Sequence, residues 1–265
     1  MSNSSIEVPV YAVFTDEELG YMGNPASVVE LSKPLAVGDM QALAAAYRQP
    51  ATTFLVRNPR QPAEFSVRWF APDEEIGLCG HGAAAAGAYL GQKYKGLETF
   101  TLRYGAGSME VHFQYPDQVS LLLEAIPVTQ EIEVPEAIRA GLGIPILAMY
   151  ETGNKHLILT ESEHHLRAMQ PNFEWLRASE IFGYAVTAPG DKVDFVSRTL
   201  VPHVQQLEDY ATGSSHAMLS PFWSKRLAKA NMTAHQLSSR GGAFHIQVTG
   251  SKVRLTGHFR REKEG

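Results

Sequence analysis

The chain has 265 residues, which is enough for one large domain or two of ordinary size, each with a substantial core. The formal net charge is -5, and the 23 basic and 28 acidic side chains are spread without blocks, which argues against nucleic acid and anionic membranes as partners. The sequence contains no run of ~18 apolar residues and no signal-peptide pattern at its start, and its single cysteine cannot form an internal disulfide. We therefore expect a cytoplasmic protein with neither a membrane nor a nucleic-acid partner.

Periodicity predicts a regular order of elements in the first half of the chain. Residues 37–47 have a helical pattern, residues 52–56 and 65–70 resemble strands, and a long helix begins at Gly80. A hairpin is predicted over residues 100–115, where two glycines mark the turn.

The second half repeats this order. A partly helical stretch is predicted at residues 164–179, and two strands follow at residues 183–189 and 193–202. A long helix is predicted at residues 212–229, and further strands that contain glycines are predicted at residues 240–257. An Arg-x-x-x-Pro pattern at Arg68 and again at Arg198 fixes the register of the repeat, although such a pattern also arises by chance.

The repeat predicts an α+β protein made of two similar domains, residues 1–125 and 126–265. Prolines and acidic residues interrupt the periodicity at residues 124–137, where we place the boundary. This division leaves open whether the carboxy-terminal tail packs on the first domain.

Both long helices are predicted to begin with small residues. These are Gly80, His81 and Gly82 in the first half and Thr212, Gly213, Ser214 and Ser215 in the second. A helix start leaves backbone N–H groups unpaired and carries partial positive charge, so an anion can approach it closely where side chains are small. If the two domains face each other, both starts can share one small carboxylate in a cleft between them.

Helix capping and close packing offer a simpler explanation for the same small residues. Neither start is a nucleotide-binding loop, because the spacing Gly-x-Gly-x-x-Gly is absent and no Lys-Ser or Lys-Thr follows Gly87. The histidines show no His-x-x-x-His spacing, and no Cys-x-x-Cys occurs. We expect no cofactor and no metal.

Groups that can exchange protons flank both starts. His81 lies at the first, while Asp209, Ser214 and His216 flank the second. An imidazole near a helix start favours its neutral form, which suits accepting or relaying a proton, although a single histidine is more often structural. A Ser-His-Asp hydrolase could use the same residues, but no Gly-x-Ser-x-Gly elbow is present.

Four segments of the chain resemble a known family. Residues 11–29, 68–87, 198–216 and 238–248 are similar to the phenazine-biosynthesis PhzF-like proteins, relatives of diaminopimelate epimerase and proline racemase. The resemblance runs from about Val10 to Thr256. It implies two pseudo-symmetric α+β domains, each a curved sheet or barrel around a central helix, with the active site between them and a homodimer as the assembly.

The resemblance also implies a reaction. Well-studied family members isomerise a dihydro-hydroxyanthranilate by moving a proton, without cofactor or metal. Their histidine, aspartate and serine match His81, Asp209 and Ser214. Other family positions match the turn residues Asn24 and Pro25 and the loop residues Arg240, Gly241 and Gly242.

One family position differs in this chain. The family's Ser-Glu-Thr segment, which carries the acid-base glutamate, corresponds to Pro50-Ala51-Thr52. Ala51 cannot accept a proton, and the loss of a positioned general base typically lowers the rate ~10²- to 10⁴-fold.

Cys79 matches the first of two acid-base cysteines in the racemase relatives, but Thr212 occupies the second place. Two-thiol epimerisation is therefore not expected. Cys79 could still act as a single acid-base group, because a helix start lowers the pKa of a thiol. The alternative is a small buried residue, which we favour.

The leading hypothesis is an isomerase of this family that acts on a small carboxylate. His81, Asp209 and Cys79 are the candidates for proton transfer, with acid and base left unassigned. The candidate substrate-binding residues are Asn24, Gly80, Gly82, Thr212, Gly213, Ser214, Arg240 and Gly241. The second hypothesis, based on Ala51, is a ligand-binding or regulatory homologue that has lost the chemistry.

Overall fold

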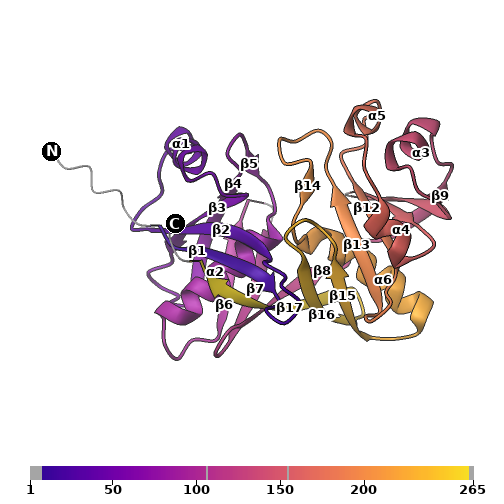
Figure 1. Cartoon of the computed structure of the whole chain (residues 1–265). Coiled ribbons are helices and arrows are strands. Elements are labelled where there is room, and N and C mark those ends of the chain that lie inside the picture. The colour runs from indigo at the N-terminus through magenta and orange to yellow at the C-terminus, as the bar shows by residue number, and fades with distance from the viewer. Residues whose placement is uncertain (1–7, 106, 154, 263–265) are drawn as a thin grey trace. The chain divides into compact units, whose positions relative to one another are not determined.

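The computed structural model describes residues 8–105, 107–153 and 155–262. Strands and helices mix throughout these residues, which confirms the predicted α+β class. The chain divides into two compact units (Figure 1). The first contains residues 25–121 with both described ends, 8–13 and 258–262, and the second contains residues 14–24 and 122–257.

The first unit is built on a closed barrel of eight strands among the described residues. The strands are β1 (Val10–Thr15), β2 (Asn24–Leu31), β3 (Ala51–Arg57), β4 (Glu64–Phe70), β6 (Thr99–Tyr104), β7 (Gly107–Gln114), β8 (Gln118–Glu124) and β17 (Lys252–Arg261). From β2 onward, the pairings are parallel to β3, antiparallel to β4, parallel to β6 and antiparallel to β7. The short strand β5 (Glu75–Ile76) pairs with β4, and α1 (Val37–Tyr47) packs on β3 and β4.

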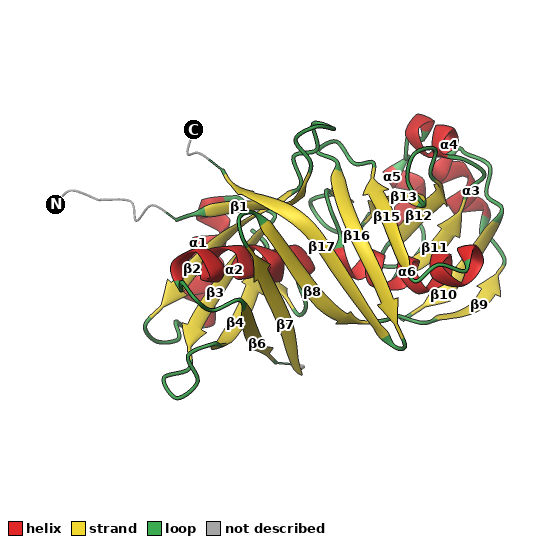
Figure 2. Ribbon diagram, turned by 90° about the horizontal axis from the view of Figure 1, so that it is seen from below, coloured by secondary structure: helices red, strands yellow, loops and turns green. Residues whose placement is uncertain are grey.

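Helix α2 (Gly80–Lys93) is the core helix of this unit and contacts β3, β6 and β7 (Figure 2). Ten of its fourteen residues are buried, and most of these are alanine or glycine. Small side chains are required here, because a Cβ at Gly91 would lie 2.0 Å from the Phe113 ring. Deep burial of the helix therefore explains its alanine-rich sequence.

The second unit repeats the same order of pairings. Its strands are β9 (Val128–Ile132), β10 (Ala148–Thr152), β11 (His156–Leu159), β12 (Tyr184–Pro189), β13 (Phe195–Leu200), β14 (Glu208–Asp209), β15 (Asn231–Gln236) and β16 (Gly242–Thr249). From β11 onward, the pairings are again parallel to β12, antiparallel to β13, parallel to β15 and antiparallel to β16. The core helix is α6 (Gly213–Leu227), which contacts β12 and β16 (Figure 2).

Three short helices belong to the same unit. They are α3 (Glu136–Leu142), α4 (Glu163–Ala168) and α5 (Phe173–Arg177). Their buried faces include Ile138, Leu166 and Leu176, which join the apolar core under β12 and β13. The predicted partly helical stretch 164–179 is therefore two helices, which are separated at Pro171.

The two arginines that fixed the predicted register have matching roles. Arg68 in β4 forms a two-pronged ion pair with Glu75 in β5, with distances of 2.7 and 2.5 Å. Arg198 in β13 pairs in the same way with Glu208 in β14, at 2.8 Å for both contacts. Each pair fixes the two-residue strand that precedes a core helix.

Residues 14–24 join the second unit through backbone hydrogen bonds. The N–H of Met22 donates to the carbonyl of Arg240, and the N–H of Gly23 donates to that of Gly241. This places Asn24 beside residues that are distant from it in sequence. Within the described residues, no helix is both long and apolar enough to cross a membrane.

Candidate active site

Helix α6 begins at Thr212 without a side-chain cap among the described residues. The Thr212 hydroxyl instead donates to the carboxylate of Asp209 at 2.7 Å. The first intrahelical bond is the one from the N–H of His216 to the carbonyl of Thr212. Capping therefore does not account for the polar residues at this start, and the partial positive charge of the helix remains available to an anion.

Asp209 is held by three donors. Its Oδ1 accepts from the side-chain amide of Asn24 at 2.8 Å and from the N–H of Tyr210 at 2.9 Å, while its Oδ2 accepts from Thr212. Charge-assisted hydrogen bonds of this kind are the stronger ones, so the orientation of the carboxylate is fixed.

Asn24 is completely buried and also donates to the carbonyl of Ala211 at 3.0 Å. A flipped amide would place its oxygen against the Asp209 carboxylate and the Ala211 carbonyl, so the hydrogen bonds determine its orientation. The Asn24 Oδ1 has no partner among the described residues. The position is thus specific for an amide, because an apolar residue could not make both contacts.

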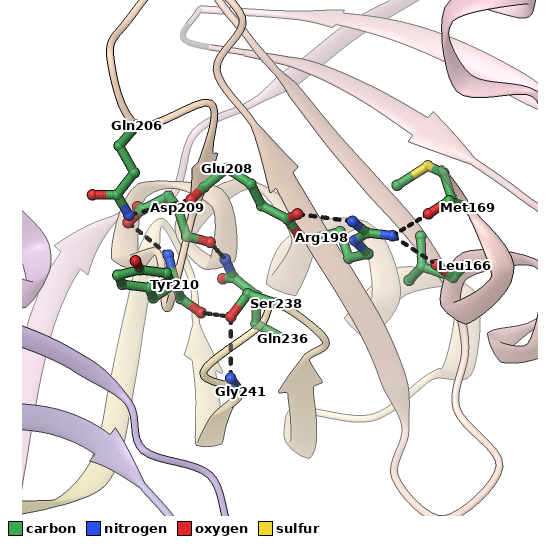
Figure 3. A network of polar contacts seen from close by, with 10 residues as sticks. All are labelled: Leu166, Met169, Arg198, Gln206, Glu208, Asp209, Tyr210, Gln236, Ser238 and Gly241. Carbon is green, nitrogen blue, oxygen red and sulfur yellow. Dashed lines mark hydrogen bonds and ion pairs between the residues drawn. The ribbon is translucent and has the colours of Figure 1, made fainter. Parts of the chain in front are cut away.

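Gln236 in β15 supports the same loop from the other side. Its amide donates to the backbone carbonyl of Asp209 at 2.7 Å, and its oxygen accepts from the N–H of Thr212 at 2.8 Å. Figure 3 shows the contact between Gln236 and Asp209. It also shows the Ser238 hydroxyl, which donates to the carbonyl of Tyr210 and accepts from the N–H of Gly241. The loop before α6 is therefore fixed on both sides.

Arg240 and Gly241 stabilise the loop that carries Asn24. Arg240 donates to the carbonyl of Gly23 at 2.8 Å, and Gly241 has a φ of 70° with the Tyr21 ring against it. A Cβ at Gly241 would lie 2.3 Å from that ring, so only glycine fits. Both residues therefore position Asn24, and their predicted role in substrate binding stays a prediction.

Lys155, which the sequence interpretation did not select, lies at the start of α6. Its ammonium donates to the Ser214 hydroxyl at 3.0 Å and lies 5.7 Å from the centre of the Phe182 ring. The residue is only 5% exposed. Burial lowers the pKa of Lys155 to about 8, against the opposing charge of Asp209. Its only sequence signal is a charged residue directly before a buried strand, which is too common to predict a site.

His216 belongs to the core and not to a catalytic triad. Its Nδ1 donates to the carbonyl of Thr212 at 2.9 Å, and its ring stacks on Phe244 with the centroids 3.7 Å apart. Burial lowers the pKa of His216 to about 4, so the ring is neutral at physiological pH. The Ser214 hydroxyl accepts its hydrogen bond from Lys155. Ser214 and His216 therefore lack the contact that a Ser-His-Asp hydrolase requires.

The start of α2 has a different arrangement. The Sγ of Cys79 accepts from the N–H of Gly82 at 3.4 Å and thereby caps the helix. The same sulfur lies 3.6 Å from Nδ1 and 3.8 Å from Nε2 of His81, and both residues are buried. Cys79 thus has a structural role as a cap and is also in contact with the imidazole; proton transfer by either group stays a prediction.

Gly82 is explained by packing. A Cβ there would lie 2.7 Å from Cδ1 of Trp69 and 2.9 Å from Oγ1 of Thr53, which itself donates to the Gly82 carbonyl at 3.0 Å. The indole N–H of Trp69 has no partner among the described residues. Gly80 is the first residue of α2, as predicted.

The position of the family's glutamate holds no titratable group. Ala51 opens β3, pairs with Ala26 in β2 and is completely buried. Glu75 in β5 and Glu208 in β14 are each bound by an arginine. The hydrogen bonds from Arg68 also lower the pKa of Glu75.

The predicted residues therefore form two groups. Cys79, His81 and the glycines of α2 belong to the first unit, and the others belong to the second: Asn24, Asp209, Thr212, Gly213, Ser214, Arg240 and Gly241. Over the described ranges, no three His, Cys, Asp or Glu side chains converge as a metal site would require.

Comparisons with known proteins agree on one family. The family model described as phenazine biosynthesis-like protein matches residues 11–265. A curated protein from Pseudomonas aeruginosa, named an uncharacterized isomerase, is 34% identical over 239 residues, which is 90% of each chain. A solved structure of a PhzF-family protein from Enterococcus faecalis is 31% identical, has a TM-score of 0.86 and covers 97% of this chain and 98% of the other.

A more distant structure supports the fold alone. The crystal structure of a probable proline racemase from Agrobacterium radiobacter is 11% identical, with a TM-score of 0.63 over 97% of this chain and 92% of that one. The predicted epimerase-like architecture is therefore confirmed.

The buried lysine leads to a prediction about stability. We expect Lys155→Met to raise the free energy of unfolding by up to about 3 kcal/mol at pH 7, because the folded protein no longer buries an ammonium group. The pKa is lower in the folded state than in the unfolded state, so the parent gains stability as the pH rises from about 8 to about 10.5. The difference in the free energy of unfolding between the parent and Lys155→Met should therefore become smaller over that pH range.

Urea unfolding of the parent and of Lys155→Met at pH 7 and pH 10 measures this difference in the free energy of unfolding. The exposed Lys192→Met is the matched control, and it should show no comparable gain. A Lys155→Met protein that is less stable than the parent at both pH values would mean that the ammonium is fully compensated in the fold.

Proposed function

Because the chain belongs to the phenazine biosynthesis-like family, we propose that it is an isomerase that moves a proton on a small carboxylate substrate without a cofactor. The observation that carries this proposal is the fixed Asp209 carboxylate beside an uncapped start of α6, with Ser214 in its first turn. A helix start binds a carboxylate, and an adjacent titratable group can move a proton on it.

Substrate binding is assigned to the first turn of α6. The backbone N–H groups of Gly213 and Ser214 point toward the helix start, and the Ser214 hydroxyl adds a polar group. In this proposal the carboxylate of the substrate accepts from these groups. The same donors would stabilise the negative charge that develops on the carboxylate oxygens when a neighbouring carbon loses its proton.

Proton transfer is assigned to Asp209 and His81, with Cys79 as the partner of the imidazole. Asp209 has the fixed orientation that a general acid or base requires. The Cys79 sulfur lies within 3.8 Å of both ring nitrogens of His81, so a proton can pass between thiol and imidazole. We propose a role in proton transfer for each of these groups.

The test is exchange of carbon-bound hydrogen in D₂O. We expect the parent to introduce deuterium next to the carboxyl group of a small cyclic or amino-acid-derived carboxylate, as measured by NMR. Asp209→Asn and His81→Ala should each lower the exchange rate ~10²- to 10⁴-fold, because each removes a proton-transferring group. The exposed His245→Ala serves as the control and should exchange at the parent rate.

Two results would contradict these assignments. Undiminished exchange by Asp209→Asn would remove the aspartate from the mechanism, and undiminished exchange by His81→Ala would remove the histidine. Absence of exchange by the parent across the carboxylate panel would contradict the isomerase proposal itself.

Ala51 favours a second candidate, a ligand-binding or regulatory homologue. The side chain is a buried methyl group where the resemblance places a glutamate. If the chain is such a binder, Ala51→Glu should produce deuterium exchange where the parent shows none, and Ala51→Gln, which has the same shape without a titratable group, should not. Exchange by the parent itself rules out the binder.

A further inference from the structure

Lys155 is the buried titratable group that the assignments above leave unused. It precedes β11 and reaches the first turn of α6, where its ammonium lies 3.0 Å from the Ser214 hydroxyl oxygen. The ammonium donates to the hydroxyl oxygen, and a neutral amine keeps two N–H groups that can donate to the same oxygen, so this contact persists in either protonation state and leaves the lone pair of the amine available. The geometry thus allows Lys155 to gain or lose a proton without moving.

The surroundings of Lys155 favour the neutral amine more than water does. Burial is the largest influence, and it lowers the pKa to about 8. The start of α6 acts in the same direction through its partial positive charge. Asp209 in β14 opposes both, while Phe182 and Gly183, which pack on the lysine from the loop before β12, carry no charge.

The three acidic side chains of the short strands β5 and β14 are engaged. Glu75 and Glu208 are bound by arginines, and Asp209 accepts from three donors. Position 51, where the resemblance places the family's general base, is an alanine. The proposed function does not say which group takes the carbon-bound proton first, and Asp209 already uses both carboxylate oxygens to accept hydrogen bonds.

We propose that Lys155 is the general base of the isomerisation, and that it takes the carbon-bound proton of the substrate and later returns it. This inference rests on the proposed function. Ser214 holds the amine in place through the hydrogen bond described above.

The step balances. The neutral amine forms an N–H bond to the proton while the C–H bond breaks, and the electron pair of that bond remains on the substrate as a carboxylate-stabilised carbanion. The ammonium then gives up a proton, directly or through the proton-transferring groups of the proposed function, to another carbon of the same system, where a new C–H bond forms and the lysine is neutral again. Nothing is oxidised or reduced, and no further reactant is needed.

The substitution of Lys155 by arginine distinguishes a general base from a residue that contributes only a positive charge. Lys155→Arg keeps a cation that can donate to Ser214, but a guanidinium does not lose its proton in proteins. If Lys155 only attracts the carboxylate or supports the loop, the arginine variant will work. If it is the base, the arginine variant will fail as completely as Lys155→Met.

The experiment measures deuterium exchange by the parent, Lys155→Arg, Lys155→Met and the surface control Lys192→Met, with thermal unfolding of each protein recorded beside it. We expect both Lys155 variants to remain folded and to lose ~10²- to 10⁴-fold in rate, and the control to match the parent. The rate of the parent should rise with pH up to about 8 and then level off, as the amine loses its proton.

A second readout does not depend on activity. In protein labelled with [¹³C]lysine, the Cε signal that Lys155→Arg removes should titrate near pH 8, and a midpoint near the ordinary value of 10.5 would overturn the inference. Parent-like exchange by Lys155→Arg would also overturn it while leaving the isomerase proposal intact. Absence of exchange by the parent, in contrast, contradicts the proposed function.

Discussion

The hydrogen bond from Asn24 to Asp209 is the contact on which the second unit's site depends. It joins residues that are 185 positions apart, and its donor Asn24 is completely buried while Asp209 is partly buried. Replacing a buried donor leaves its acceptor unsatisfied, which typically costs ~1–3 kcal/mol or more for a charged group. The rest of the loop follows from it: Thr212 donates to the same carboxylate instead of capping α6, and Gln236 fixes the backbone between the two residues.

The site uses charges that the fold does not need for stability. A buried lysine at the positive end of a helix is unfavourable for folding, and the start of α6 keeps N–H groups that a capping residue could have satisfied. The start of α2 shows the contrast, because Cys79 caps it and Gly82 packs against Trp69. One helix start is thus capped by a side chain of the protein, whereas the start of α6 has no side-chain cap among the described residues.

The sequence predicted the fold well because the repeat has a physical basis that can be read locally. Strand and helix periodicities depend on neighbouring residues, and Arg68 and Arg198 recur because each fixes the short strand before a core helix. The helix starts were also predicted, since small residues before an apolar stretch are a local signal. Cys79 was interpreted as either an acid-base group or a small buried residue, and the structure adds its capping role.

The remaining features depend on contacts between distant segments. Lys155 precedes a strand like many surface lysines, and only the folded chain buries it and brings its ammonium to Ser214 in α6. Residues 14–24 lie early in the chain, yet their hydrogen bonds to Arg240 and Gly241 place them in the second unit. His216 was among the residues that a Ser-His-Asp hydrolase could use, but its stacking on Phe244 could not be predicted from the sequence.

The deuterium exchange rate of Asn24→Leu tests most directly whether the hydrogen bond from Asn24 orients Asp209. The substitution removes no group that can transfer a proton. If the contact with Asn24 orients Asp209, the variant should remain folded and lose roughly 10²-fold in rate, as misplaced catalytic groups do. A folded Asn24→Leu protein that exchanges at the parent rate would show that the orientation of Asp209 does not matter, and it would contradict the central claim.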